Sequence, residues 1–191
     1  MTRRYAVIFG VFLVVMAGVG AVLFWAVPRW YRTPKTAAVA APAPVAAVIP
    51  GRKIKARLFY VADDGARLTN VEREVAYGEG PVDQARQIVE AQIAPAAEPQ
   101  VSAIPPATRL RAIFLTERAE AFVDFSSELA TGHTGGSTDE ILTVYSIVNV
   151  LTSNLPAVKS VQILVNGKQI ETLAGHVDLR RPLAQNLEWV E

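Results

Sequence analysis

The sequence predicts an α+β fold in which β-hairpins alternate with two helices, in the order β-β-α-β-β-α-β-β. Apolar residues recur at helical spacing over about residues 81–93 and again over about residues 139–155. Asp64-Gly65 and Asn166-Gly167 each separate two strand-like runs, and both dipeptides are strong hairpin signals. Because hairpins pair neighbouring strands, the sheet is expected to be largely antiparallel.

The segment before this fold predicts a membrane anchor. Residues 5–27 contain no charged side chain. At ~1.5 Å rise per residue they would span ~34 Å as a helix, enough for a hydrocarbon core of ~30 Å. Trp25, Trp30 and Tyr31 lie where aromatic side chains anchor one end of a span. We therefore expect a single transmembrane helix over residues 5–27, preceded by a cytoplasmic tail, residues 1–4.

A cleaved signal peptide and a buried soluble helix are the alternatives for this segment. A signal peptide has an apolar core of only ~7–15 residues followed closely by a small-residue cleavage site. Here the apolar core is longer, and the nearest such site, Ala38-Val39-Ala40, lies well beyond it. The length and the flanking residues favour an uncleaved anchor over both alternatives.

Residues 28–51 form an Ala/Pro-rich linker that favours extended chain and cannot build a core. Arg3, Arg4 and the amino terminus oppose Arg29, Arg32 and Lys35 across the predicted span, so local charge leans against export of the C-terminal side. Long domains are translocated largely regardless of charge. We expect the globular domain to lie outside the cytoplasmic membrane, in the periplasm or the extracellular space.

Composition excludes several classes of site. The chain has no cysteine, so a disulfide, a thiolate nucleophile and a cysteine-bound metal or lipid are impossible. From Gly51 onward there are 14 basic and 18 acidic residues, a net charge of −4. A mildly acidic body argues against nucleic-acid binding, which needs a basic face.

The globular region, residues 52–183, is expected to open with strands over residues 55–62 and 67–77. Pro81 begins the first helix, in which Val82, Ala85, Ile88, Val89 and Ile93 share one face. Residues 94–108 are rich in Pro and Ala and are long for a loop inside a domain, which indicates a mobile or functional segment.

The second half of the domain repeats the pattern. Strands are expected over residues 110–115, 121–125, 161–165 and 168–173, and the second helix over about residues 139–155. The core face of that helix is expected to carry Ile141, Tyr145, Val148, Leu151 and Leu155.

The stretch FVDFSSELATGHTGGSTDE, residues 122–140, holds the residue types of a Ser-His-Asp hydrolase, among them Asp124, Ser126 and His133. It lacks the G-x-S-x-G motif, the phosphate-binding glycine motifs and any metal-ligand spacing. Ser137 and Glu140 fit a helix capping box. We therefore expect Asp124 to fix the exit from a strand and residues 129–136 to be exposed, with His133 at the tip.

Several short motifs follow one another along residues 54–183. They are Leu58-Phe59-Tyr60 with Asp63-Asp64-Gly65, Glu72-Arg73-Glu74-Val75, Ile104-Pro105 with Thr108, residues 121–126, residues 140–155, residues 161–165 with Asn166-Gly167, and Gly175-His176-Val177-Asp178 with Arg181-Pro182. In order and spacing they resemble the GerMN domain, named from spore germination and sporulation proteins. Ala107 stands where that family usually has glycine.

The resemblance implies a fold like the ring-building modules of envelope assemblies, with residues 184–191 as a C-terminal tail. Proteins of that family are typically tethered to the cell envelope, many as lipoproteins, and no catalytic residues are assigned to them. No catalytic, cofactor-binding or metal-binding residue is therefore predicted. The candidates for structural or interaction roles are Asp124, Ser126, His133, Ser137, Glu140, Asn166, Gly167, Asp178 and Arg181.

Two functions follow as hypotheses. The first is a membrane-anchored, envelope-facing binding or scaffold module without catalytic activity or cofactor, whose partner is an envelope protein or a second copy of the chain. The second is an envelope hydrolase, or an enzyme that binds a small ligand, using the Asp124–His133 loop. Convergence of His133 with Ser126 and Asp124 in one pocket would favour the second hypothesis.

Overall fold

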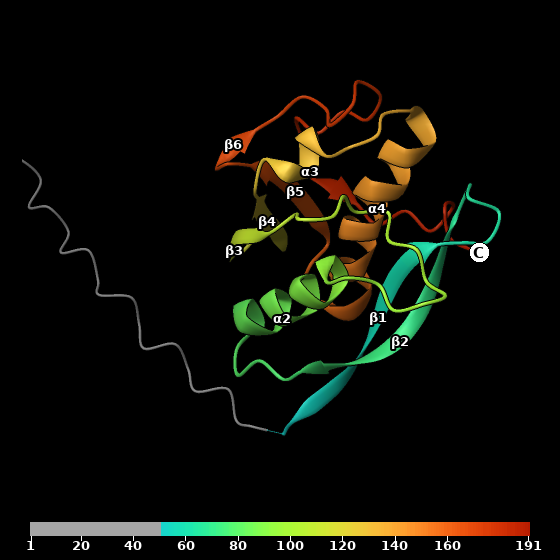
Figure 1. Ribbon diagram of the computed structural model, residues 1–191. Helices are drawn as coiled ribbons and strands as arrows, with labels where there is room; N and C mark the ends of the chain where they lie inside the picture. Colours follow the sequence, from blue (N-terminus) through green and yellow to red (C-terminus); the bar gives the residue numbers. More distant parts are fainter. Residues whose placement is uncertain (1–50) are drawn as a thin grey trace, which may run out of the picture. The chain divides into compact units, whose positions relative to one another are not determined.

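The computed structural model describes residues 51–191, and their strands and helices follow the predicted alternation (Figure 1). The predicted membrane segment, residues 5–27, the tail before it and the linker up to residue 50 lie outside the described residues. Within residues 51–191, no helix combines the length and the apolar character needed to cross a membrane.

The elements are β1 (Lys53–Val61), β2 (Leu68–Ala76), α2 (Pro81–Ile93), β3 (Leu110–Leu115), β4 (Glu120–Phe125), α3 (Glu128–Thr131), α4 (Ser137–Asn154), β5 (Ser160–Val165), β6 (Lys168–Gln169) and β7 (Leu183–Ala184).

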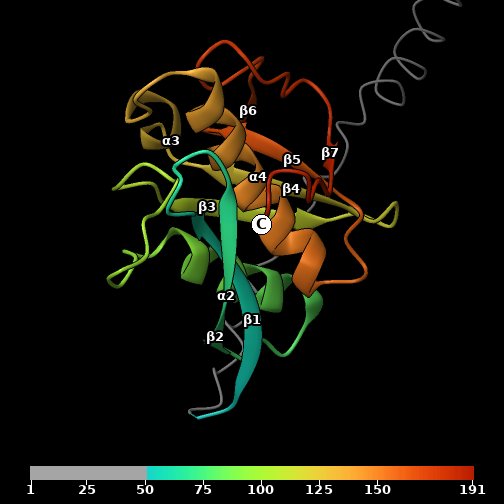
Figure 2. The same ribbon diagram turned by 90° about the vertical axis from the view of Figure 1, so that its right-hand side faces the viewer.

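The strands form two separate sheets. Strands β1 and β2 make a two-stranded antiparallel hairpin whose register runs from Lys53 opposite Ala76 to Val61 opposite Leu68. The second sheet has the order β3-β4-β5-β6, and β7 also pairs with β5. Helices α2 and α4 contact the hairpin on one side and the five-stranded sheet on the other, so they form the layer between them (Figures 1 and 2).

The strands of residues 51–191 are largely antiparallel, as expected, with one exception at the centre of the second sheet. Strands β4 and β5 pair in parallel, from Glu120 opposite Ser160 to Phe125 opposite Val165. The connection between them contains α4, and a helical crossover returns the chain to the end of the sheet where β4 began. The next strand must then run in the same direction. Hairpin signals report pairing between neighbouring strands only, so they did not reveal this pair.

Helix α4 is buried on more of its circumference than its apolar pattern predicts. Val148 and Leu151 are fully buried as expected, but Ile141, Tyr145 and Leu155 are only partly buried. Four polar residues at intervals of three, Glu140, Thr143, Ser146 and Asn149, are buried as well. The helix packs against α2, β1 and β5 at once, so a single apolar stripe could not line all of these contacts.

The predicted face of α2 is confirmed at its centre. Ala85, Ile88 and Val89 have at most 1% of their surface exposed, whereas Val82 at the start of the helix is 39% exposed. Two glutamines, Gln84 and Gln92, are buried beside the apolar residues, although no spacing argument predicts polar side chains there.

The outer edge of β1 is closed by side chains rather than by a third strand. The Gln92 amide accepts a hydrogen bond from Phe59 N–H at 2.9 Å and donates one to the Phe59 carbonyl at 2.6 Å. The Asn154 side-chain amide of α4 likewise accepts from Arg57 N–H and donates to the Arg57 carbonyl, both at 2.8 Å. Val61 N–H donates to the Val101 carbonyl at 2.8 Å. Because a buried unpaired backbone group is costly, these contacts fix both helices and residue 101 to β1.

Two turns require a left-handed backbone. Asn166 and Gly167, between β5 and β6, have φ of 52° and 74°, which confirms the predicted hairpin turn. The strand after this turn is shorter than expected and ends at Gln169. Ala107 has φ of 70°, so the backbone keeps a conformation suited to the glycine usual in the GerMN domain.

Replacing Gly167 with Val should lower the free energy of unfolding by about 1 kcal/mol or more, since a β-branched side chain is disfavoured at positive φ. The change is measured by urea denaturation of the full chain. Lys168→Val, one residue further along and on an exposed strand position, is the control and should have a smaller effect. Equal losses from both substitutions would contradict the turn assignment.

Candidate functional site

A pocket with a volume of about 390 Å³ lies beside the start of α4. Its walls come from residues 101–106, residues 132–134, and Asp139, Leu142 and Thr143 of α4, and Val61 and Gly65 complete it. The Pro- and Ala-rich segment that was expected to be mobile or functional thus supplies one wall. The Val61–Val101 backbone bridge holds that segment against β1.

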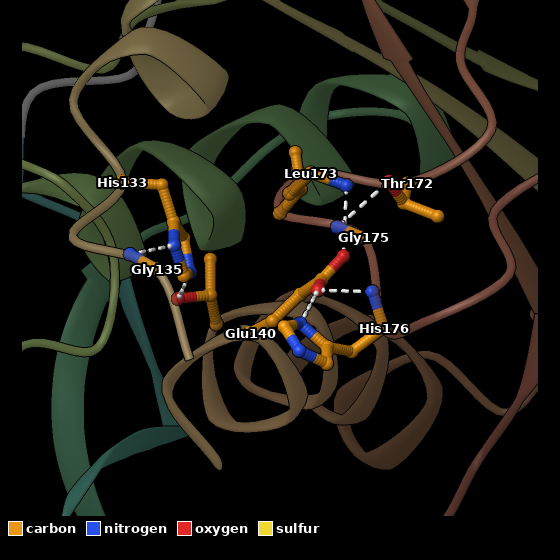
Figure 3. Close-up of polar contacts among 8 residues, drawn as sticks. His133, Gly135, Glu140, Thr172, Leu173, Gly175 and His176 are labelled. Atoms are coloured by element: carbon orange, nitrogen blue, oxygen red, sulfur yellow. Dashed lines mark hydrogen bonds and ion pairs between the residues drawn. The ribbon is translucent and has the colours of Figure 1, made fainter. Parts of the chain in front are cut away.

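His133 lies in this pocket and not at an exposed loop tip. Its Nδ1 accepts a hydrogen bond from Gly135 N–H at 3.0 Å, and its Nε2 lies 3.3 Å from Thr143 Oγ1 (Figure 3). The Thr143 hydroxyl donates to the Ala103 carbonyl at 2.6 Å. The single Thr143 hydroxyl proton is used on Ala103, so in this contact the Thr143 oxygen is the acceptor and His133 Nε2 is the donor. Both ring nitrogens are therefore used in holding the loop to α4 and to residue 103.

The expectation of a free, exposed loop over residues 129–136 is wrong for a second reason. Residues 128–131 form the short helix α3, and Leu129 is fully buried. Leu129, at the start of this span, anchors it to the core, and His133 follows the anchored turn. The hydrophobic character of Leu129 is the sequence signal that could have indicated this.

Asp124 fixes the end of its strand as expected, but through distant partners. Its Oδ1 accepts a hydrogen bond from Gly167 N–H at 2.6 Å, and its Oδ2 lies 3.5 Å from Nε of Arg111. Arg111 also donates to the Asn166 side chain at 2.7 Å. The buried Asp124 carboxylate therefore ties β4 to the β5–β6 turn and to β3.

The two serines after Asp124 serve local structure. Ser126 Oγ accepts a hydrogen bond from Arg109 N–H at 3.1 Å, and the Ser127 hydroxyl lies 3.4 Å from a carboxylate oxygen of Glu128. Among residues 51–191, no hydrogen bond joins either serine or Asp124 to His133. The structure thus separates the side chains that a Ser-His-Asp mechanism must bring together.

The predicted capping box at the start of α4 is wrong. The N-cap residue is Gly136, with no side-chain cap, and Ser137 is already the first helical residue. The Glu140 carboxylate points away from the helix start. Its Oε1 accepts from Leu173 N–H at 2.8 Å, and its Oε2 accepts from His176 N–H at 2.8 Å and lies 3.2 Å from His176 Nδ1 (Figure 3). A buried carboxylate surrounded by free N–H groups is stabilised more by them than by one N-cap bond.

Glu140 is fully buried yet is favoured in its charged form. Burial by itself would raise its pKa, but hydrogen bonds from the backbone N–H groups of residues 174, 176, 173 and 177 together lower the pKa below the ordinary value of 4.5. The loop of residues 173–177 is thus folded around this carboxylate. The sequence places Glu140 and residue 176 in separate motifs, so only the tertiary structure shows that they meet.

Asp178 and Arg181, the remaining candidates, do not form a pair. Asp178 is bound by Arg180, which donates from its backbone N–H, its Nε and one terminal nitrogen. This side-chain contact, more than any other influence, lowers the pKa of Asp178 to about 2. Arg181 is exposed and contributes only a weaker charge effect.

Residues that the sequence did not single out hold the site in place. Thr143 connects the pocket loop to residue 103, and Gln92 and Asn154 connect the helices to β1. The recurrence of polar residues every three positions along α4 is the one signal that could have indicated Thr143. No group of three or more His, Asp or Glu side chains within residues 51–191 is arranged to hold a metal ion.

Replacing Glu140 with Gln should lower the free energy of unfolding at about pH 7 by about 1–3 kcal/mol, because hydrogen bonds to a charged acceptor are lost. The pKa of Glu140 is lower in the folded chain, so its contribution is fully present above about pH 4.5 and is lost as the pH falls through the folded-state value. Urea denaturation across this range should show the two proteins converging at low pH. The control is Glu171→Gln, at an exposed position just before this loop. If Glu140→Gln lowered the free energy of unfolding by the same amount at every pH, the assignment of a charged, hydrogen-bonded Glu140 would be contradicted.

Comparisons with known proteins agree with this fold. The structure is similar to the tandem GerMN domains of the sporulation protein GerM from Bacillus subtilis, with a TM-score of 0.52 and 16% identity over 71% of this chain and 46% of that chain. The first GerMN domain of the same protein matches with a TM-score of 0.49 and 18% identity, over 70% of this chain and 96% of that one. A Clostridium perfringens protein described as a "putative lipoprotein" matches with a TM-score of 0.49 and 20% identity, over 69% of this chain and 87% of that one.

At 16% identity, the match to the tandem GerMN domains shows the fold only. No curated protein sequence matches the chain. The family model named Germane, described as "Sporulation and spore germination", matches residues 57–171, which is more than half of the sequence. On this match the chain belongs to the Germane family.

Proposed function

We propose that this protein is a non-catalytic binding or scaffold module of the cell envelope, held at the cytoplasmic membrane by residues 5–27 and contributing to a protein assembly outside it. Membership of the Germane family supports a module of this type. The uncharged 23-residue segment and the Ala/Pro-rich linker of the sequence support the tethered arrangement. The mildly acidic body supports a protein partner rather than a nucleic acid.

The observation that carries the proposal is the use of Asp124, Ser126 and His133, the residues that suggested a hydrolase, in structural contacts. Asp124 binds the β5–β6 turn, Ser126 binds the backbone of residue 109, and both nitrogens of His133 are occupied. A general base needs a nitrogen that can reach the nucleophile or an intervening water. The alternative, an envelope hydrolase or ligand-binding enzyme using the Asp124–His133 loop, finds no support in this arrangement.

The pocket beside α4 is the proposed binding site. It is built on a helix, a strand edge and a loop that is anchored at both His133 and Leu129, so it is formed before any partner arrives. A pre-formed concave surface with apolar walls and a few polar groups is the usual setting for recognition. Val101, which is 59% exposed, stands at its rim and is well placed to meet a partner.

The topology is tested with a reporter fused after Glu191. An alkaline phosphatase fusion, active only outside the cytoplasm, should be active, and a matched fluorescent fusion that requires the cytoplasm should be dark. The opposite pattern would place the domain in the cytoplasm and overturn the envelope assignment. Deleting residues 5–27 should release the protein from the membrane fraction.

The binding role is tested by placing a photo-crosslinking amino acid at Val101 in the full chain in cells. We expect a discrete adduct in the membrane fraction that is absent when the crosslinker replaces Glu72, an exposed position on β2 away from the pocket. Ser126→Ala should leave the adduct unchanged. A loss of cellular function in Ser126→Ala, with normal protein levels and no adduct at Val101, would favour the hydrolase.

A further inference from the structure

The pocket beside α4 has apolar walls. Val61, Val101, Ile104, Pro105, Pro106 and Leu142 contribute carbon surface to it. A volume of about 390 Å³ lies at the low end for ligand pockets, so it suits one long side chain better than a nucleotide or a folded peptide. The walls would cover the aliphatic part of such a side chain.

The polar side chains of the pocket are mostly committed to neighbouring backbone groups and to one another. Ser102 Oγ exchanges hydrogen bonds with the backbone of Ile104, at 3.1 Å from its N–H and 3.3 Å from its carbonyl. Thr143 donates to residue 103 and accepts from His133, whose other nitrogen is also occupied. None of these groups is left with a donor for a ligand, so an anionic or carbonyl-bearing ligand would find no partner among them.

Asp139 is the exception. Its Oδ2 accepts from the Thr134 hydroxyl at 3.2 Å, and its Oδ1 has no hydrogen-bond partner among residues 51–191. The side chain is exposed and lies in the first turn of α4, where the positive end of the helix dipole favours a negative charge. No lysine or arginine lines the pocket, so this carboxylate is not neutralised from within it.

We infer that the pocket receives the side chain of a lysine or arginine from a protein partner, with its aliphatic part against the apolar walls and its cation on Asp139. Lysine and arginine are the side chains that combine a long apolar stem with a terminal charge. The net charge of −4 from residue 51 onward favours the approach of a basic partner. This inference rests on the proposed function, since it names the chemistry of the partner at the same site.

The test titrates the full chain with acetyl-Gly-Lys-Gly-amide, with the arginine peptide, and with the norleucine peptide, which keeps the stem and lacks the charge. Backbone NMR signals of Gly65, Thr134 and Thr143 report on the pocket. We expect the Lys and Arg peptides to shift these signals with weak affinity, and the norleucine peptide to bind about fivefold more weakly, as the loss of one exposed ion pair predicts. Raising the salt to about 0.5 M should weaken the charged peptides only.

Two variants that each remove one carboxylate test whether Asp139 is the group that binds the cation. Asp139→Asn should weaken binding of the Lys and Arg peptides about fivefold while keeping an acceptor for Thr134. Asp83→Asn removes the same charge from the first turn of α2, outside the pocket, and should change binding by less than about twofold. Equal effects of the two variants would show only a general attraction to an acidic surface, and would overturn the inference.

The remaining outcomes are also decisive. Norleucine binding as tight as lysine would mean that the pocket is apolar in its preference, so the cation assignment fails while the binding role stands. Spermidine binding more tightly than either basic peptide would identify a free polyamine as the ligand instead of a protein side chain. If a crosslinked adduct formed at Val101 but no peptide shifted the NMR signals of the pocket, this inference would fail while the proposed function would stand.

Discussion

The free edge of β1 is the constraint on which the rest of the domain depends. Phe59 lies in the core with no exposed surface, so its outward-facing N–H and carbonyl cannot be satisfied by water. Gln92 of α2 and Asn154 of α4 supply the missing donors and acceptors, and residue 101 supplies an acceptor further along. One strand edge therefore fixes the positions of both helices and of the segment that walls the pocket.

On the other side of the domain, polar side chains of helix α4 likewise bond backbone groups of distant segments. Three of its four buried polar residues each reach a different part of the chain: Glu140 holds residues 173–177, Thr143 holds residue 103, and Asn149 bonds the backbone of residue 186 in both directions. The fourth, Ser146, donates back to the Thr143 carbonyl within the helix. A helix that packs on three neighbours cannot satisfy loops through its backbone, because its own N–H and carbonyl groups are already used. Side chains must connect it to the irregular segments.

The use of polar side chains in structural hydrogen bonds explains why a stretch that resembles a catalytic loop is structural. The residue types that catalysis uses are also the ones that fix turns. Here Asp124 and Ser126 accept from backbone N–H groups of other segments, and His133 bonds Gly135 of its own loop and the Thr143 side chain of α4. The proposed recognition role draws on the shape of the pocket, together with the one pocket carboxylate oxygen left without a partner among residues 51–191. Recognition of this kind needs no reacting group.

The sequence by itself determined the local structure: the order of strands and helices, the buried centre of α2 and the Asn166-Gly167 turn, because each depends on neighbours along the chain. It also indicated that residues 94–108 were unusual and that Asp124 was structural. Only the tertiary structure decided that β4 and β5 run parallel, that Glu140 leaves the helix start for residues 173–177, and that His133 turns inward to Thr143. These depend on which distant backbone groups lack partners after the elements pack, and no spacing rule contains that information.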